Sequence, residues 1–102
     1  KYKVNPNKRN DKKVVPLHLA STARVAKILV KGGANMTISD YGKDKPLHWA
    51  AFRNLYEVAE ILISLGADVN IRGNDGRTPL YYSGRKTYKD ISKLLKANGG
   101  HT

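Results

Sequence analysis

The chain has no cysteine among its 102 residues, and only one methionine, one tryptophan and one phenylalanine. Without cysteine it can form no disulfide framework, no thiolate nucleophile and no zinc–thiolate site. The absence of cysteine fits a reducing compartment. We therefore expect the protein to act inside a cell, in the cytoplasm or nucleus, or as a secreted effector inside a host cell.

Long apolar runs are also missing. No stretch approaches the eighteen or more apolar residues of a membrane span, and no segment has the pattern of a secretory signal. We expect no transmembrane segment. At this length the chain has room for a single core.

Acidic residues are scarce: 8 Asp and Glu stand against 19 Lys and Arg, which gives a net charge of +11. Such a balance favours acidic partners and speeds encounter with them. The lysines Lys86, Lys89, Lys93 and Lys96 are spaced like one helical stripe, for which a solvated outer face is the simplest interpretation. A surface that binds nucleic acid or an anionic membrane is the alternative.

Residues suited to catalysis are few. The sequence has no arrangement typical of a serine or cysteine nucleophile, no phosphate-binding loop and no His-x-x-x-His pair. The glycine pairs Gly32-Gly33 and Gly99-Gly100 follow expected helices, which is the wrong end for phosphate. His18 and His48 are the obvious candidates for catalysis or metal binding, but their motif below favours a structural role. We expect no enzyme, no cofactor and no metal.

What the chain does contain is a repeat. DYGKDKPLHWAAFRNLYEVAEILISLGADVNIR (40–72) is followed by GNDGRTPLYYSGRKTYKDISKLLKANGG (73–100), with Pro46 and Pro79 thirty-three residues apart. A third copy, VVPLHLASTARVAKILVKGGANMTIS (14–39), lies upstream, but Pro16 precedes Pro46 by only thirty residues. The three missing residues fall between Ala20 and Val25, at the link between two expected helices. The first helix of this upstream copy must therefore end early, or the turn between its two helices must tighten.

Each unit has the pattern of two short helices. In the middle unit, apolar residues at spacings of three and four precede and follow Asn54, and small residues there suit close helix packing. Asn54 and Gly66 can adopt the left-handed conformation that ends a helix. Thr78 is a good N-cap, whereas Val15 and Lys45 at the same position cannot cap, which weakens those helix starts by about 1 kcal/mol each.

The period and the Pro-Leu-His-x-Ala motif at residues 16–20 and 46–50, with Thr-Pro-Leu at 78–80 and Gly-Ala-Asp-Val-Asn at 66–70, resemble the ankyrin repeat. The resemblance covers residues 10 to 100. It implies an all-α solenoid of stacked helix-turn-helix units, joined by β-hairpin-like turns near residues 36–45 and 69–78. It also implies that His18 and His48 tie one repeat's turn to its neighbour by hydrogen bonds.

The expected organisation is repeat 1 at 14–39, repeat 2 at 40–72, repeat 3 at 73–100 and a tail at 101–102. Repeat 3 resembles a C-terminal cap, because Lys96 stands where repeat 2 has Ile63 and would make the outer face polar. Residues 1–13 are either a basic disordered arm or the remnant of an upstream repeat that ends in Val4-Asn5. We favour the arm because Asn5-Pro6-Asn7 is typical of a turn.

For this family, function means non-catalytic binding of another protein on the concave face made by the turn tips and first helices. We expect a monomer that acts as a scaffold or adaptor and binds a protein, possibly an acidic one. Tyr41 and Phe52 amid arginines have the composition of an interface hot spot, and the alternative is that they only cover a neighbouring turn. Carried over by register, the concave face holds Asp11, Lys12, Val14, Tyr41, Gly42, Asp44, Phe52, Arg53, Arg72, Asn74, Asp75, Arg77, Arg85 and Lys86.

One modification site is suggested by the same resemblance. Leu62 to Asn70 is similar to the context in which eukaryotic ankyrin repeats are hydroxylated on the asparagine by the hypoxia-pathway asparaginyl hydroxylase. Asn70 is therefore a candidate hydroxylation site, although a structural role in the turn explains it equally well.

Overall fold

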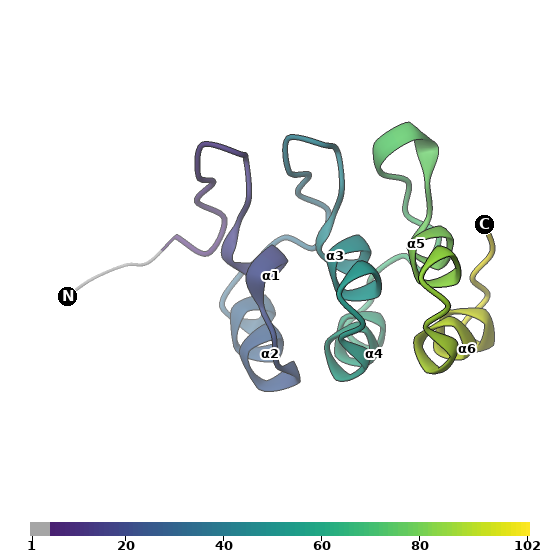
Figure 1. Cartoon of the computed structure of the whole chain (residues 1–102). Helices are drawn as coiled ribbons and strands as arrows, with labels where there is room; N and C mark the ends of the chain where they lie inside the picture. Colours follow the sequence, from purple (N-terminus) through teal and green to yellow (C-terminus); the bar gives the residue numbers. More distant parts are fainter. Residues whose placement is uncertain (1–4) are drawn as a thin grey trace.

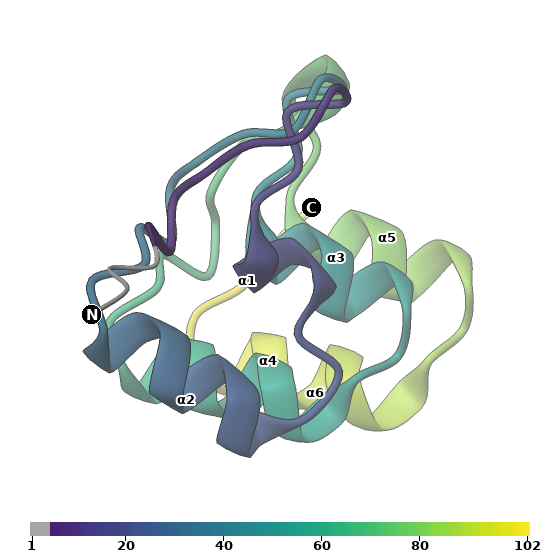
Figure 2. The same ribbon diagram turned by 90° about the vertical axis from the view of Figure 1, so that its left-hand side faces the viewer.

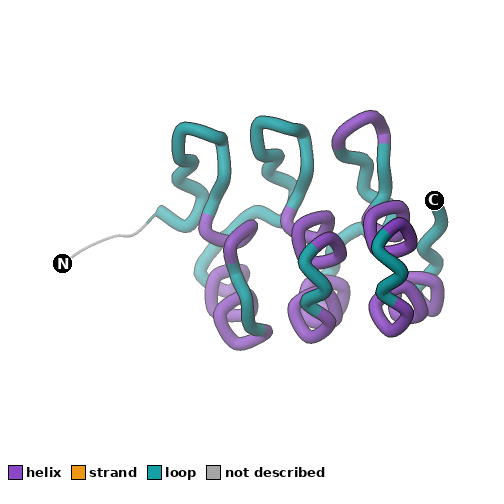
Figure 3. The backbone as a smooth tube through the Cα atoms, viewed as in Figure 1, coloured by secondary structure: helices purple, strands orange, loops and turns teal. Residues whose placement is uncertain are grey.

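The computed structural model describes residues 5–102. Those residues form three helix pairs that stand side by side, each with a loop above it (Figure 1). Within them lie six α-helices and one short 3-10 helix, and Figure 3 shows no strand. The helices are α1 (Pro16–Leu19), α2 (Ala23–Lys31), α3 (Pro46–Phe52), α4 (Tyr56–Ser64), α5 (Pro79–Arg85) and α6 (Lys89–Ala97), with η1 at Asn74–Gly76.

The helices form two layers. Seen from the end of the stack, α1, α3 and α5 lie behind one another, α2, α4 and α6 form the second layer, and the loops project together (Figure 2). Neighbouring pairs contact each other first helix to first helix and second helix to second helix. The molecule measures 44 × 26 × 18 Å. This is the all-α solenoid that the repeat predicts.

Local chemistry explains where the helices begin and end. Proline opens α1, α3 and α5, where its missing N–H and fixed φ are tolerated. Thr78 caps α5, since its hydroxyl accepts the N–H of Tyr81 at 3.4 Å, whereas Val15 and Lys45 make no side-chain cap. Asn54 at φ 58° and Gly66 at φ 105° follow α3 and α4 in the left-handed conformation.

The three residues missing from the first unit shorten its first helix. The helix α1 has four residues, whereas α3 and α5 have seven each. Ala20 already has an extended backbone, and α2 begins three residues later with Thr22 as its N-cap. The expected early end of the first helix is confirmed.

Three loops of the same shape, here called fingers, precede the helix pairs at residues 10–14, 40–44 and 73–77. In each, the first residue's N–H donates to the last residue's carbonyl, at 2.9, 2.8 and 2.8 Å. Each loop turns at a residue with positive φ: Lys13 at 63°, Lys43 at 73° and Gly76 at 71°. All three turns are hairpin-like. The second and third fall within the predicted ranges 36–45 and 69–78, and the first, at 10–14, was not predicted.

Residues 5–13, expected as an arm or as the remnant of an upstream repeat, form the first finger and the segment before it. Arg9 donates to the Ser39 carbonyl at 2.6 Å, and the Tyr41 N–H donates to the Lys12 carbonyl at 2.8 Å. Residues 5–13 are thus bonded to the next unit, and the choice between arm and remnant stays a prediction. Residues 1–4, including Val4, lie outside the described part. The boundaries of the three repeats stay a prediction.

The core follows the stack from end to end. Apolar side chains from all three pairs form one cluster, and several of its members are alanines. No helix in residues 5–102 has both the length and the apolar content needed to cross a bilayer. The core includes Leu17, Leu47, Ala50, Ala51, Val58, Ala59, Leu62, Leu80, Ile91 and Leu95.

Candidate functional site

Two buried histidines join the helix pairs. His18 accepts the N–H of Val15 on Nδ1 at 3.0 Å, so its proton lies on Nε2, which donates to the Asp44 carbonyl at 3.0 Å. His48 accepts the N–H of Lys45 at 3.0 Å and donates to the Arg77 carbonyl at 2.9 Å. Each ring thus ties its helix to the finger of the next unit. The structural role that the resemblance implies is confirmed.

This arrangement favours neutral imidazole. Burial lowers the pKa of His18 and His48 below the ordinary value, although the carbonyl each ring donates to partly opposes the shift. Protonation would also place a hydrogen on Nδ1, which accepts a backbone N–H. Both rings are therefore poor acids or bases for chemistry on a bound molecule.

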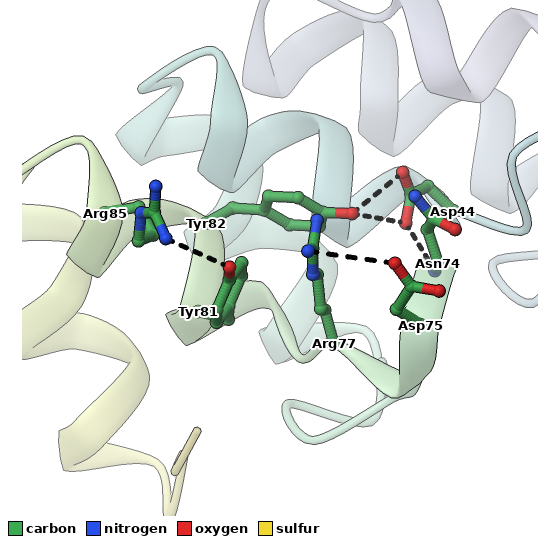
Figure 4. A network of polar contacts seen from close by, with 7 residues as sticks. All are labelled: Asp44, Asn74, Asp75, Arg77, Tyr81, Tyr82 and Arg85. Atoms are coloured by element: carbon green, nitrogen blue, oxygen red, sulfur yellow. Dashed lines mark hydrogen bonds and ion pairs between the residues drawn. The ribbon is translucent and has the colours of Figure 1, made fainter.

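Asp44 connects all three units, and Figure 4 shows its contacts with the third. Its carbonyl accepts from His18, while its carboxylate accepts the Asn74 N–H at 3.0 Å and the Tyr82 hydroxyl at 3.0 and 3.1 Å. Burial and the hydrogen bond to Asp44 raise the pKa of Tyr82 to about 12. Asp44 was predicted to contact a partner, and in the free protein its carboxylate is occupied by these internal contacts.

Beside Asp44 lies a pocket of about 310 Å³ on the concave face. The Trp49 indole N–H donates to Asp40 at 2.8 Å, which fixes the ring at one wall. Phe52 meets Tyr82 edge to face, with ring centres 6.0 Å apart. The pocket is lined by Asp40, Asp44, His48, Trp49, Phe52, Arg53 and Tyr82.

A second hollow of about 390 Å³ continues from the first, with Phe52 and Tyr82 in both linings. Its aromatic rings carry cations: Arg77 lies 4.6 Å from the Tyr81 ring centre, and Lys86 Nζ lies 4.8 Å from that of Phe52. We call the two hollows together the aromatic trough. The second is lined by Phe52, Arg77, Tyr81, Tyr82, Arg85 and Lys86.

Positive charge dominates the trough because its lining has four cations and two acids, and both acids already accept hydrogen bonds within the protein. Asp40 accepts from Trp49, and Asp44 accepts from Tyr82 and Asn74. Within residues 5–102 one ion pair occurs, between Arg77 and Asp75 at 3.7 Å. Of the other trough cations, Lys86 lies over the Phe52 ring and Arg85 donates to the Tyr81 hydroxyl at 3.3 Å.

The structure gathers six of the predicted concave residues at the trough and leaves seven on or beside the fingers. Val14 differs: it is 7% exposed, because its N–H and carbonyl both bond to Asn10 and close the first finger. Arg72 braces the third finger by donating to the Gly76 carbonyl at 2.8 Å. At the trough are Asp44, Phe52, Arg53, Arg77, Arg85 and Lys86. The remaining seven are Asp11, Lys12, Tyr41, Gly42, Arg72, Asn74 and Asp75, all exposed.

Five lining residues were missed from the sequence: Asp40, His48, Trp49, Tyr81 and Tyr82. Register could have found two of them, since Trp49 and Tyr82 are thirty-three residues apart, like Pro46 and Pro79. Both rings are half-exposed on the concave face. No sequence pattern points to Asp40, because its role depends on the hydrogen bond that the Trp49 indole donates to it.

Outside the trough, two further predictions can be placed. Lys89, Lys93 and Lys96 are exposed on α6, and Lys86 is separated from them at the end of α5. Asn70 donates to the Gly99 carbonyl at 3.0 Å and accepts the His101 N–H at 2.9 Å. Its amide thus holds the turn to the tail, and hydroxylation at Asn70 stays a prediction.

Comparison with protein families gives an independent result. A family model described as ankyrin repeats, in three copies, matches residues 2–73. The comparison with curated proteins found no match. The third helix pair, α5 and α6, lies beyond the matched residues and repeats the geometry of the second. Ankyrin repeats are generally protein-interaction modules and are typically non-catalytic. From the match and the stacked geometry together, the chain belongs to the ankyrin-repeat family.

Proposed function

We propose that this protein is a non-catalytic interaction module that binds a partner protein in the aromatic trough and against the finger tips. The observation that carries the proposal is the trough itself, where exposed rings and cations from two neighbouring repeats meet. Phe52, at the centre of the trough, is 50% exposed, and Tyr41 on the second finger is 79% exposed. Interfaces are enriched in aromatic residues and arginine, which supply most of the binding energy when a partner excludes water.

The charges of the trough indicate what the partner brings. Arg53, Arg85 and Lys86 surround Phe52 and Tyr81. A segment with acidic residues beside an apolar side chain would place the apolar group on Phe52 and its carboxylates on the cations. The rings also need little rearrangement, since Tyr82 is already held by Asp44. Such preorganisation lowers the ordering cost of binding.

The alternative, a basic surface that binds nucleic acid or an anionic membrane, rests on net charge alone. Basic residues occur on the fingers, the trough and the exposed side of α6 alike. Non-specific phosphate binding would use all of them and would weaken steeply with salt. Binding in the trough would depend on which face carries the charge.

Two variants of equal net charge separate these functions. One carries Arg53→Glu, Arg77→Glu and Arg85→Glu in the trough, and its matched control carries Lys89→Glu, Lys93→Glu and Lys96→Glu on α6. Each changes the net charge by the same amount. A protein captured from the source cell after nuclease treatment, at moderate salt, should be lost from the trough variant and kept by the α6 variant.

A further pair tests the rings without changing charge. Phe52→Ala should weaken the complex by about tenfold or more, as expected for a hot-spot aromatic, whereas Tyr56→Ala on α4 should leave it unchanged. Circular dichroism of each variant checks that the stack is folded. Equal loss in both charge variants, or capture of nuclease-sensitive material alone, would contradict binding in the trough.

A further inference from the structure

The end of the stack formed by the first unit exposes apolar residues. Figure 2 looks onto this end, with α1 and α2 nearest the viewer. Val25 is 45% exposed and Ile28 61% exposed on α2, and Leu19 is 54% exposed at the end of α1. Leu19 and Val25 line an open groove of about 480 Å³ together with Val14, Pro16, Ala20 and Leu29. Ile28 lies outside this lining.

The other two units show what normally covers these positions. Val58 and Ile91, the residues in register with Val25, are 2% and 0% exposed. Leu62 and Leu95, in register with Leu29, are both 0% exposed, whereas Leu29 is half-buried. The helices α4 and α6 each pack against the second helix of the preceding unit, and α2 has none in the described structure. The apolar pattern of α2 is that of an internal repeat.

The chain before the first finger also has an internal repeat's conformation. Asn7 donates to the Gly33 carbonyl at 3.1 Å and accepts the Asn35 N–H at 2.7 Å, which are the contacts that Asn70 makes with Gly99 and His101. Asn5 accepts the N–H of Asn7 at 2.9 Å, as Asp68 accepts that of Asn70 at 2.9 Å. Asn70 and Asp68 lie just beyond the end of α4. Residues 5–9 therefore follow the path of a chain that leaves the second helix of a repeat.

We infer that the exposed end of α1 and α2 is the docking face for one more ankyrin-type helix pair, carried by the same polypeptide upstream of the described residues. Its second helix packs on α2 as α2 packs on α4, and its first helix covers Leu19. The helix that does this for α4 is α2, in which Ala26 is buried and Val30 half-buried. A small, apolar covering face is therefore expected.

Charge argues against a second copy of this chain as the occupant. Arg24, Lys27 and Lys31 are exposed on α2, and α2 contains no acidic residue. The opposite end carries the exposed lysines of α6, so both head-to-head and head-to-tail contacts would bring like charges together. A covering helix with acidic residues suits this end, and α4 with the exposed Glu57 and Glu60 is an example.

The test extends the chain by one unit. Residues 45–66 are copied in place of residues 1–3, which keeps the copied Gly66 in register before Val4. In urea unfolding, Val25→Asn should lower the midpoint about fourfold more in the extended chain than in the original, because an exposed site becomes a core site. Lys27→Asn is the matched control, since Lys27, Glu60 and Lys93 are exposed in every unit. Lys27→Asn should shift the urea midpoint of both proteins equally.

Hydrogen exchange gives a second readout. Amides of residues 23–31 should exchange more slowly in the extended chain than in the original, while those of α6 should be unchanged. Equal effects of Val25→Asn in both proteins, or a copied unit that adds no helix by circular dichroism, would overturn the inference. So would sedimentation of the original chain as a dimer that Ile28→Asp converts to monomer, because a second copy would then be the occupant.

Discussion

At the scale of single residues, Asp44 does most to hold the repeats in place. Its backbone carbonyl bonds to the unit before it, and its carboxylate bonds to the unit after it. Gly73 lies against the same carboxylate: a Cβ added there would overlap Asp44 and come within 2.9 Å of the His48 ring. The site is thus built by close approach of two fingers, and only glycine fits between them.

The first prediction concerns this contact. Asp44→Ala should lower the free energy of unfolding by about 1–2 kcal/mol, because it leaves the Tyr82 hydroxyl and the Asn74 N–H without their partner. Asp75→Asn is the matched control on the third finger, since asparagine tolerates the left-handed backbone of Asp75 at φ 55°. Its single ion pair is long and exposed, so the change should be within about 0.5 kcal/mol. Urea unfolding of both variants measures the difference, and equal effects would show that Asp44 is not a connecting residue.

The second prediction concerns pH. Burial lowers the pKa of His18 and His48 in the folded protein, so below about 6.5 the unfolded state binds more protons than the folded state. Their contribution to stability is therefore complete above that pH and is lost as the pH falls through the lowered values. The urea midpoint should fall between pH 7.5 and pH 5.5.

A titration of the ring carbons by NMR identifies the groups responsible. Both buried histidines should titrate below the ordinary value while the protein is folded. Midpoints at or above that value would contradict the neutral tautomers that the hydrogen bonds require.

At the scale of elements, the first helix pair is the least complete. Its first helix has four residues, and Val25 and Ile28 of α2 lie open to solvent. Fewer buried apolar contacts mean a smaller free energy for local opening. We therefore predict that residues 14–31 exchange their amide hydrogens more readily than residues 46–65. Exchange followed by mass spectrometry measures this directly, and equal protection of the two segments would disprove it.

The sequence predicted the elements better than the contacts between them. The prolines, the helical spacing around Asn54 and the shortened link in the first unit were enough to place all three helix pairs. These features act within one unit, so the local sequence is enough to predict the helices. Trp49 donates to Asp40 and Tyr82 to Asp44, each in another segment. The local sequence does not predict these hydrogen bonds.

At the scale of the whole molecule, the trough exists because two repeats stack. Phe52 ends the first helix of one unit, and Tyr82 lies in the first helix of the next. Neither repeat alone has both walls. Register predicted the concave face. The structure adds that the centre of this face lies between α3 and α5, and that its acids, Asp40 and Asp44, accept hydrogen bonds from within the protein.

The measurement that tests the central claim most directly is hydrogen exchange on the complex with a captured partner protein, compared with the free chain. Binding in the aromatic trough predicts slower exchange at residues 46–53 and 79–86 and in the fingers at 40–44 and 73–77. Residues 56–64 and 89–97, on the second helices, should exchange as they do in the free protein. Protection confined to α4 and α6, with α3 and α5 unchanged, would contradict the claim that the partner binds in the trough.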